Sequence, residues 1–218
     1  FYSDGRLNLR KLEHNVERYS KTLGTGLVVL GAGGEATMLS DEETRLVLES
    51  VRDAAASEKV LTAGVSRDSV AGTLGLAEFA AGLGYDAILV RRPSFVRSSQ
   101  ELVSYFEVVA DRSALPVVLS SSAATGGWHL PSETVAALAG HPRVIGLVDG
   151  ERGRIEALKQ ATSAVQHEVT VTAVFSAVTG RMQAGKRGET LISAGTLGGG
   201  GAALATSVPK AALMTRTK

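Results

Sequence analysis

Apolar positions recur along the first 165 residues with two different periods. Short apolar runs bounded by glycine or polar residues predict buried strands, and longer segments with apolar positions three or four residues apart predict helices. The predicted strands are residues 26–31, 60–64, 86–90, 116–119 and 144–148. The predicted helices are residues 7–22, 40–56, 68–83, 99–111, 131–139 and 151–165. This alternation predicts βαβ units and a parallel sheet.

The start of the second helix carries a local signal of its own. Ser40 is followed three residues later by Glu43, which is the pattern of a capping box. A parallel sheet built from such units is either an open doubly wound sheet or a (β/α)8 barrel. The even spacing and the absence of a Pro/Gly-rich linker favour the barrel, although periodicity alone leaves both architectures open.

The tail of the chain, residues 167–218, does not continue the alternation of strands and helices. We predict barrel units over residues 1–166 and an atypical, glycine-rich segment over residues 167–218. Two interpretations of the tail remain open. In one, residues 169–175 are the seventh strand, 190–198 the seventh helix and 201–208 the eighth strand. In the other, residues 167–213 are an insertion after the sixth helix, and the seventh strand lies beyond Lys218.

The composition excludes several classes of protein. With 23 Lys and Arg against 22 Asp and Glu, the net charge is +1, which argues against nucleic-acid binding. No apolar run reaches the ~18 residues of a membrane span, so we expect no membrane partner. The chain has no cysteine, and its four histidines have no metal-binding spacing, so we expect no metal site. This composition is compatible with the cytoplasm, which we predict as the location.

A glycine-rich loop follows the first predicted strand. Residues 31–36 read G-A-G-G-E-A and fit the dinucleotide-binding fingerprint. The fingerprint expects an acidic residue near the end of the next strand, and none occurs there before Asp68. The next helix also begins late, at Ser40. We therefore favour a tight loop and keep a nucleotide-binding α/β domain, with Gly31, Gly33 and Gly34 at its loop, as the alternative.

Polar side chains follow two other predicted strands. Ser120, Ser121 and Ser122 end the strand at residues 116–119, and Arg91 ends the strand before it. Parallel α/β proteins bind ligands at the carboxyl ends of their strands. Hydroxyls and a guanidinium at these positions predict binding of a carboxylate or phosphate, while a polar loop without a ligand stays an alternative.

Five segments, in order and nearly without gaps, resemble the dihydrodipicolinate synthase / N-acetylneuraminate lyase family. Residues 30–40 look like its G-T-T-G-E-x-x-x-L-S segment, and residues 61–65 look like its I-A-G-V strand. Residues 90–101 are similar to V-V-P-P-Y-Y-x-K-P-S-Q-E, and residues 116–134 to the segment that contains P-G-R-T-G. Residues 141–149 are similar to H-P-N-I-V-G-x-K-D/E.

The resemblance implies a TIM barrel and, by details of these segments, the 4-hydroxy-2-oxoglutarate aldolase branch. It also implies a homo-oligomer, either a dimer or a tetramer, and no cofactor beyond a reactive lysine. A full barrel takes roughly 250 residues. We therefore expect the sequence to be incomplete, lacking a first strand before Phe1 and a C-terminal part.

The chemistry implied by the resemblance is that of class I aldolases and lyases. In that family a lysine at the end of the sixth strand forms a Schiff base with pyruvate, and a tyrosine at the end of the fifth strand relays protons with the help of a threonine of the G-T-T-G-E loop. The same loop binds the pyruvate carboxylate. Here the lysine position is Val148, the tyrosine position is Ser120, and the threonine positions are Ala32 and Gly33. The first residue of the Y-Y pair is replaced by Ser94. Valine has no amine, so no imine can form at residue 148.

The sequence therefore predicts a lyase-like barrel protein whose catalysis is altered or lost, a pseudoenzyme in the second case. Whether it is an enzyme stays open. We expect it to bind a small 2-oxo acid or another carboxylate at the carboxyl ends of the strands. The candidate ligand-binding residues are Gly31, Gly33, Gly34, Glu35, Ser120, Ser121 and Arg91.

Overall fold

The computed structural model describes residues 1–31, 34–121 and 129–149, residues 154, 157 and 158, and the backbone of residues 170–173 and 192–194. The chain divides into two compact units. The described part of the first unit contains Phe1–Gly64, Gly82–Asp86 and one short strand near the end of the chain. The second unit contains Val65–Ala81 and the described residues that follow Asp86 up to residue 173.

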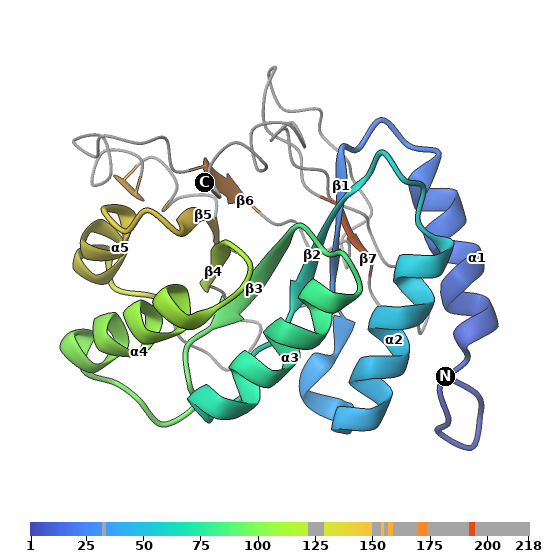
Figure 1. Cartoon of the computed structure of the whole chain (residues 1–218), viewed down its shortest axis with the longest axis horizontal. Coiled ribbons are helices and arrows are strands. Elements are labelled where there is room, and N and C mark those ends of the chain that lie inside the picture. The colour runs from blue at the N-terminus through green and yellow to red at the C-terminus, as the bar shows by residue number, and fades with distance from the viewer. Residues whose placement is uncertain are drawn as a thin grey trace. The chain divides into compact units, whose positions relative to one another are not determined.

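The first unit has three parallel strands and two long helices. The strands are β1 (Gly26–Val29), β2 (Val60–Gly64) and β7 (Ile192–Ala194), and β1 pairs with both of the others. The helices are α1 (Leu9–Ser20) and α2 (Asp41–Ala54), which lie side by side in Figure 1, with the short 3-10 helix η2 (Ala36–Met38) before α2. Apolar side chains of both helices and both long strands are buried together as the core of this unit.

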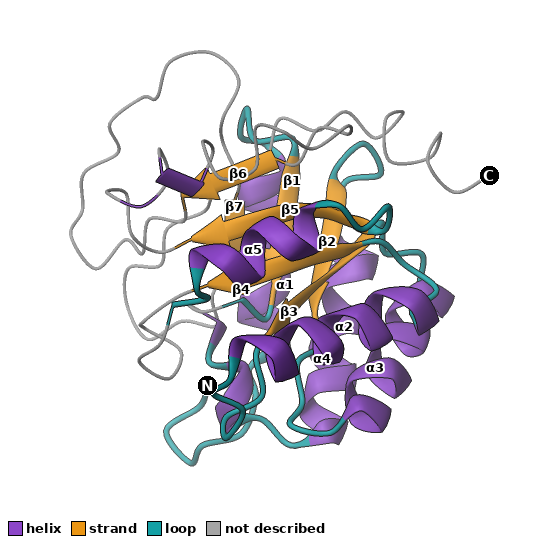
Figure 2. Ribbon diagram, turned by 90° about the vertical axis from the view of Figure 1, so that its left-hand side faces the viewer, coloured by secondary structure: helices purple, strands orange, loops and turns teal. Residues whose placement is uncertain are grey.

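The second unit has four parallel strands. They are β3 (Ala87–Arg91), β4 (Val117–Ser121), β5 (Val144–Asp149) and β6 (Thr170–Ala173), paired in that order. The helices are α3 (Val70–Gly82), which lies in this unit up to Ala81, α4 (Ser99–Arg112) and α5 (Ser132–Ala139). Figure 2 shows α4 and α5 next to each other on one side of these strands.

The five predicted strands are confirmed, and so are the first five predicted helices, with bounds that differ by at most two residues. The sixth predicted helix, residues 151–165, lies mostly outside the described residues, although Arg154, Ala157 and Leu158 are helical. In the tail, the predicted strand at residues 169–175 is confirmed for Thr170–Ala173. The division of the chain at residue 166 stays a prediction.

One prediction for the tail is wrong. Residues 190–198 were expected to form a helix in one interpretation, but Ile192–Ala194 form β7. These residues pair in parallel with Leu27, Val28 and Val29 of β1. Pairing along the edge of β1 satisfies backbone groups of both segments, and this tertiary gain outweighs the weak helical pattern of a glycine-rich segment.

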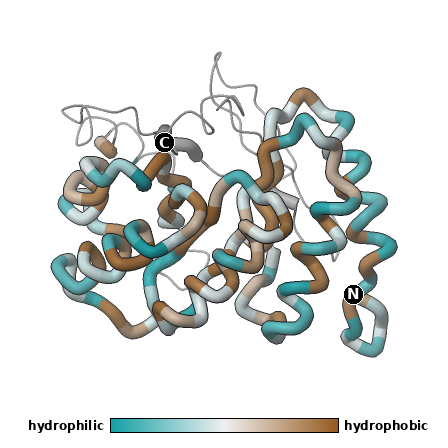
Figure 3. The backbone as a smooth tube through the Cα atoms, in the orientation of Figure 1, coloured by the Kyte–Doolittle hydropathy of each residue, from teal (hydrophilic) through white to brown (hydrophobic). Residues whose placement is uncertain are grey.

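The helices α2 and α4 each have one apolar and one polar face. Along α2 and α4 the colour in Figure 3 changes between teal and brown within each turn. The capping box of α2 is confirmed: Glu43 N–H donates to Ser40 Oγ at 3.2 Å, and Ser40 N–H donates to the Glu43 carboxylate at 2.9 Å. Within the described part of the chain, no helix has the length and apolarity that a membrane span requires.

Candidate functional site

Three positions highlighted by the sequence lie in one row across the second unit. Arg91 of β3 is the register partner of Ser120 of β4, and Ser120 is the register partner of Val148 of β5. Register partners on parallel strands present their side chains to the same face, and neighbouring strands lie about 4.8 Å apart. The structure therefore brings Arg91, Ser120 and Val148 together at the carboxyl ends of adjacent strands, although they are far apart in the sequence.

The face that carries this row is the less covered face of β4. Burial alternates along β4: Val117, Leu119 and Ser121 are buried, whereas Val118 and Ser120 are partly exposed. A strand with one covered face has this period of two. Ser120 thus belongs to the less covered face of β4.

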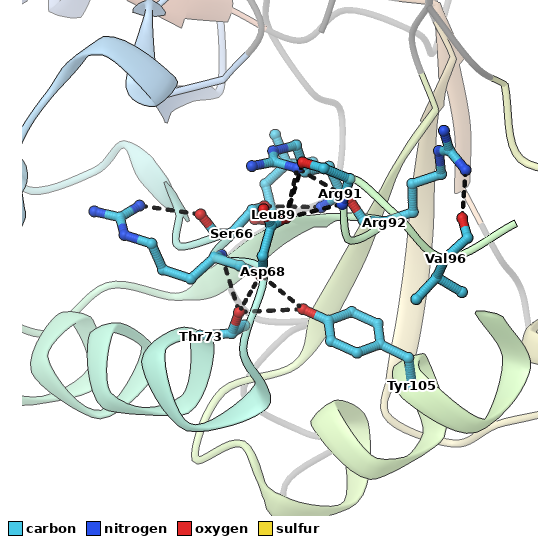
Figure 4. A network of polar contacts seen from close by, with 10 residues as sticks. Ser66, Asp68, Thr73, Leu89, Arg91, Arg92, Val96 and Tyr105 are labelled. Atoms are coloured by element: carbon cyan, nitrogen blue, oxygen red, sulfur yellow. Dashed lines mark hydrogen bonds and ion pairs between the residues drawn. The ribbon is translucent and has the colours of Figure 1, made fainter. Parts of the chain in front are cut away.

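A polar network fixes the position of Arg91, and Figure 4 shows it from close by. The Arg91 N–H donates to Ser66 Oγ at 2.8 Å, and its Nη1 donates to the Arg92 carbonyl at 3.0 Å. The same Nη1 lies 3.6 Å from Asp68 Oδ1. Asp68 Oδ1 also accepts hydrogen bonds from the backbone N–H of Ser94 at 2.8 Å and from its hydroxyl at 2.9 Å. Ser94, at the first tyrosine position of the family, is thus joined to Arg91 through Asp68.

The charges and hydrogen bonds of this network shift the pKa values of Asp68 and Arg92. Burial by itself raises the pKa of Asp68, but the hydrogen bonds from Ser94 and the charge of Arg91 outweigh it, so the pKa lies below its usual value. Burial and the charges of Arg97 and Arg91 lower the pKa of Arg92. The charges of Arg91 and Arg97 thus both act on Arg92, and Arg91 also acts on the carboxylate of Asp68.

A buried hydroxyl pair supports the loop that carries Asp68. The hydroxyls of Thr73 and Tyr105 lie 3.1 Å apart, and Thr73 Oγ1 both accepts from Arg67 N–H at 3.0 Å and donates to the Arg67 carbonyl at 3.2 Å. Burial raises the pKa of the Tyr105 phenol, and the charge of Asp68 adds to this effect, while Thr73 and Arg91 oppose it. The sequence did not point to Thr73 or Tyr105, because their partners are distant along the chain.

Ser121 lies on the opposite, covered face. Its hydroxyl donates to Asp149 Oδ2 at 2.8 Å, and the two residues are only 1% and 0% exposed. His129, which is near Ser120 in the sequence, has its Nδ1 3.4 Å from Asp149 Oδ1. A ligand-binding role for Ser121 stays a prediction, and the structure gives its hydroxyl a buried protein partner.

The glycine-rich loop belongs to the first unit. Leu30, at the end of β1, has a positive φ of 58°, and Glu35 has a φ of 50°. Positive φ is uncommon for residues with a Cβ and indicates that the surrounding structure imposes the conformation. Between these two residues the Gly34 N–H donates to the Gly31 carbonyl at 2.9 Å, which closes a turn. Gly31 and Gly34 are buried, and Glu35 is exposed.

The nucleotide-binding alternative is not favoured by this geometry. Ala32 and Gly33 lie outside the described residues. The 3-10 helix at Ala36–Met38 stands between the glycines and α2, which begins at Asp41. A dinucleotide site needs the helix N-terminus directly after the glycines, because its N–H groups bind the pyrophosphate. Across the residues that the structure describes, no group of three or more His, Asp or Glu side chains is placed to hold a metal ion.

The comparison with known families defines the class of protein. A sequence model of the dihydrodipicolinate synthetase family matches residues 1–204, and the chain belongs to this family. Its described strands and helices are part of a (β/α)8 barrel, as predicted.

Particular relatives show how much of a family member the chain covers. It is 38% identical over 162 residues to a 4-hydroxy-tetrahydrodipicolinate synthase of Xanthomonas campestris pv. campestris, covering 72% of this chain and 53% of the relative. It is 33% identical over 168 residues to an L-threo-3-deoxy-hexylosonate aldolase of Hypocrea jecorina, with the same two coverages of 72% and 53%. The chain thus spans about half the length of the curated relatives that it matches.

Solved structures support the same fold. The chain matches a chloride-inhibited dihydrodipicolinate synthase from Acinetobacter baumannii complexed with pyruvate, with a TM-score of 0.69 and 28% identity over 78% of this chain and 59% of that one. It also matches a prophage protein of the dihydrodipicolinic acid synthase family from Escherichia coli K12 in complex with pyruvate. That match has a TM-score of 0.71 and 26% identity over 80% of this chain and 60% of that one.

Proposed function

We propose that this protein binds a small 2-oxo acid or another carboxylate without a covalent bond, at the carboxyl ends of β3, β4 and β5, and that its catalysis is altered or lost. The observation that supports this proposal is the row of Arg91, Ser120 and Val148 on one face. A cation, a hydroxyl and an apolar side chain in adjacent register positions suit a small molecule that has a carboxylate and a short carbon chain.

Val148 is the reason for proposing non-covalent binding. By the family resemblance, this position would hold the lysine whose amine attacks the keto group of pyruvate. The valine side chain has no nucleophile, and Val148 is 5% exposed. It offers an apolar contact to the methyl or methylene group of a ligand and no chemistry of its own.

Ser120 and Arg91 supply the polar recognition. Ser120 is a partly exposed residue. The two contacts given above for the Arg91 guanidinium both use Nη1. A guanidinium has five N–H donors on three nitrogens, so Arg91 can contact a carboxylate while it keeps these bonds. The two solved structures named above, from Acinetobacter baumannii and Escherichia coli, contain pyruvate, and this supports a ligand of this class.

The remaining expectations extend the proposal. We propose that Gly31, Gly33, Gly34 and Glu35 contribute to ligand binding, as the resemblance implies for this loop. We also propose a homo-oligomer, either a dimer or a tetramer, and a cytoplasmic location. Light scattering after size exclusion would test the oligomer, and a single species with the mass of one chain would contradict it.

A titration with pyruvate and 2-oxoglutarate tests the proposed site. Saturable binding by calorimetry, with a rise in melting temperature, is the expected result. The Ser120→Ala variant should bind roughly 10-fold more weakly, because a hydrogen bond to a charged group contributes about 1.5 kcal/mol or more. Ser104→Ala, an exposed serine of α4, is the matched control and should keep the affinity of the wild type.

An intact mass spectrum separates binding from Schiff-base chemistry. After incubation with pyruvate and borohydride, we expect an unmodified mass. A pyruvyl adduct would show that another lysine has replaced the function of the lost one, and it would overturn the non-covalent mechanism. Turnover of a 2-oxo acid that disappears in Ser120→Ala, without any adduct, would favour a lyase that uses different chemistry.

A further inference from the structure

The carboxylate of Asp149 is completely buried, and its polar neighbours include Ser121, Arg154 and His129. It accepts hydrogen bonds at Oδ2 from the Ser121 hydroxyl at 2.8 Å and from Arg154 Nη1 at 3.0 Å. On its other side, Oδ1 lies 3.4 Å from Nδ1 of His129. The exposed fractions of the Arg154 and His129 side chains are 23% and 24%, whereas that of Asp149 is 0%.

Together with two bonds to the backbone of Leu130, these contacts form a closed ring of hydrogen bonds between Ser121, Leu130, Arg154 and Asp149. Arg154 Nη2 donates to the Leu130 carbonyl at 2.7 Å, and the Leu130 N–H donates to Ser121 Oγ at 3.0 Å. Ser121 then donates to Asp149, which accepts from Arg154. The ring therefore links the ends of β4 and β5, the residue that leads into α5, and the helical residue 154.

The ring depends on the negative charge of Asp149. A buried carboxylate is costly unless it is paired and hydrogen-bonded, and a buried guanidinium left without its partner is costly in the same way. Asparagine at residue 149 keeps one acceptor oxygen but has no negative charge to pair with Arg154, so the hydrogen bonds that Arg154 and Ser121 donate to this residue are weakened. Both of the remaining ring bonds, to the two backbone groups of Leu130, use these same side chains.

The ring lies on the face of β4 and β5 opposite to the row of Arg91, Ser120 and Val148. Ser121 follows Ser120 on β4, Asp149 follows Val148 on β5, and the two pairs are in register. Successive residues of a strand point to opposite faces. A bond between the side chains of Ser121 and Asp149 on one face therefore holds together the backbone that presents Ser120 and Val148 on the other.

We propose that Asp149 is a positioning residue, which holds Ser120 in place for the ligand through the ring of Ser121, Leu130 and Arg154. This inference rests on the proposed function for its ligand, while the ring itself can be tested without one. On β5, Val148 thus contributes an apolar contact to the ligand, and Asp149 supports Ser120 of β4.

Hydrogen exchange of the whole chain tests the ring independently of any ligand. In Asp149→Asn, the Leu130 amide should exchange at least about 10-fold faster, because its acceptor Ser121 loses its fixed orientation. Asp86→Asn is the matched control: Asp86 Oδ2 accepts from the Leu61 N–H at 2.8 Å in the first unit, so its loss should affect Leu61 and not Leu130. Unchanged exchange at Leu130 in Asp149→Asn would overturn the ring.

The affinity for pyruvate and 2-oxoglutarate tests the positioning role. Asp149→Asn should weaken binding roughly 10-fold, and Asp149→Glu should keep most of the wild-type affinity. Asp86→Asn should keep the wild-type affinity even if it lowers the melting temperature as much as Asp149→Asn does. If Asp149→Asn does not fold, Ser121→Ala, which keeps the charge pair, should give a smaller loss of the same kind. Normal affinity in the folded variants would overturn the positioning role. A wild type that binds neither acid would instead overturn the proposed function, and the exchange data would still decide the ring.

Discussion

Gly64, the last residue of β2, passes very close to the end of β1. A Cβ built on Gly64 would overlap the carbonyl group of Leu30. This carbonyl belongs to the backbone, so it cannot move away by a change of side-chain rotamer. Leu30 itself has a positive φ of 58°. The Gly64→Ala variant should therefore be destabilised by about 2 kcal/mol, the usual cost of overpacking, in urea unfolding.

The matched control for this change is a glycine in open space. Gly75 lies within α3, and a Cβ at this position would meet no atom within 4 Å. Gly75→Ala should stabilise the protein by about 0.5–1 kcal/mol, because alanine loses less backbone entropy in a helix. Equal effects of the two substitutions would contradict the close approach of Gly64 to Leu30.

Tyr85 links stability to alkaline pH. It is 3% exposed, and its hydroxyl donates to the Leu48 carbonyl at 2.9 Å. Burial raises the pKa of Tyr85 far above its usual value, although the charge of Arg52 opposes this. Above pH ~10 the unfolded tyrosine loses a proton that the folded one keeps, so the unfolded state is favoured by about 1.4 kcal/mol per pH unit. The stabilising contribution is thus complete below pH ~10 and is lost as the pH rises towards the folded-state pKa.

The Tyr85→Phe variant separates the two effects of this phenol. At pH 7 it should be less stable by about 1 kcal/mol, because the hydrogen bond to Leu48 is lost. Between pH 10 and 11 its free energy of unfolding should fall by about 1 kcal/mol less than that of the wild type. Urea unfolding at each pH gives both quantities, and parallel curves for the two proteins would contradict the raised pKa.

Residue-level features were predictable where the signal is local. Ser40 and Glu43 are three residues apart, and that spacing alone predicted the capping box. The ring around Asp149 had no such signal, since Ser121 is 28 residues away in the sequence. Its two partners meet only because β4 and β5 pair in one register, and that register is set by packing. Arg91 was predicted as a ligand residue from its strand end, but its bond to Asp68 required the fold.

At the level of elements, the cap of α2 makes a quantitative prediction. Ser40 Oγ accepts from Glu43 N–H at 3.2 Å, and the glutamate bonds back at 2.9 Å. Ser40→Ala removes the first of these bonds and should lower the free energy of unfolding by about 1 kcal/mol. Ser98→Ala at the start of α4 is the comparison, because Ser98 Oγ accepts from Glu101 N–H at the longer distance of 3.4 Å and this cap is not a capping box. A loss at Ser98 equal to that at Ser40 would contradict the reciprocal cap.

Whole elements were predicted well because strands and helices of this fold differ strongly in pattern. Residues 60–64 are mostly apolar, which is typical of a strand buried on both sides, and β2 has these bounds and is buried throughout. The error at Ile192–Ala194 has the opposite origin. The pattern of a glycine-rich segment is weak, and its pairing with β1 depends on residues more than 160 positions earlier in the chain.

For the whole molecule, the tail takes part in both units through its two strands. β6 pairs with β5 over four residues, from Gly146↔Thr170 to Asp149↔Ala173. β7 pairs with β1, whose four residues are all buried. Removing residues 167–218 would therefore leave β1 and β5 as unpaired edges, and exposed apolar edges promote association between chains.

The truncated chain 1–166 should consequently be less stable than the full chain and should aggregate as its concentration rises. Thermal unfolding and light scattering on both proteins measure this, with a loss of a few degrees or more in melting temperature expected. If residues 167–218 were a separate insertion without a role in the sheets, the truncated chain would keep its melting temperature and stay monodisperse. The same comparison tests the predicted division at residue 166, because only an independent tail can be removed without exposing a strand edge.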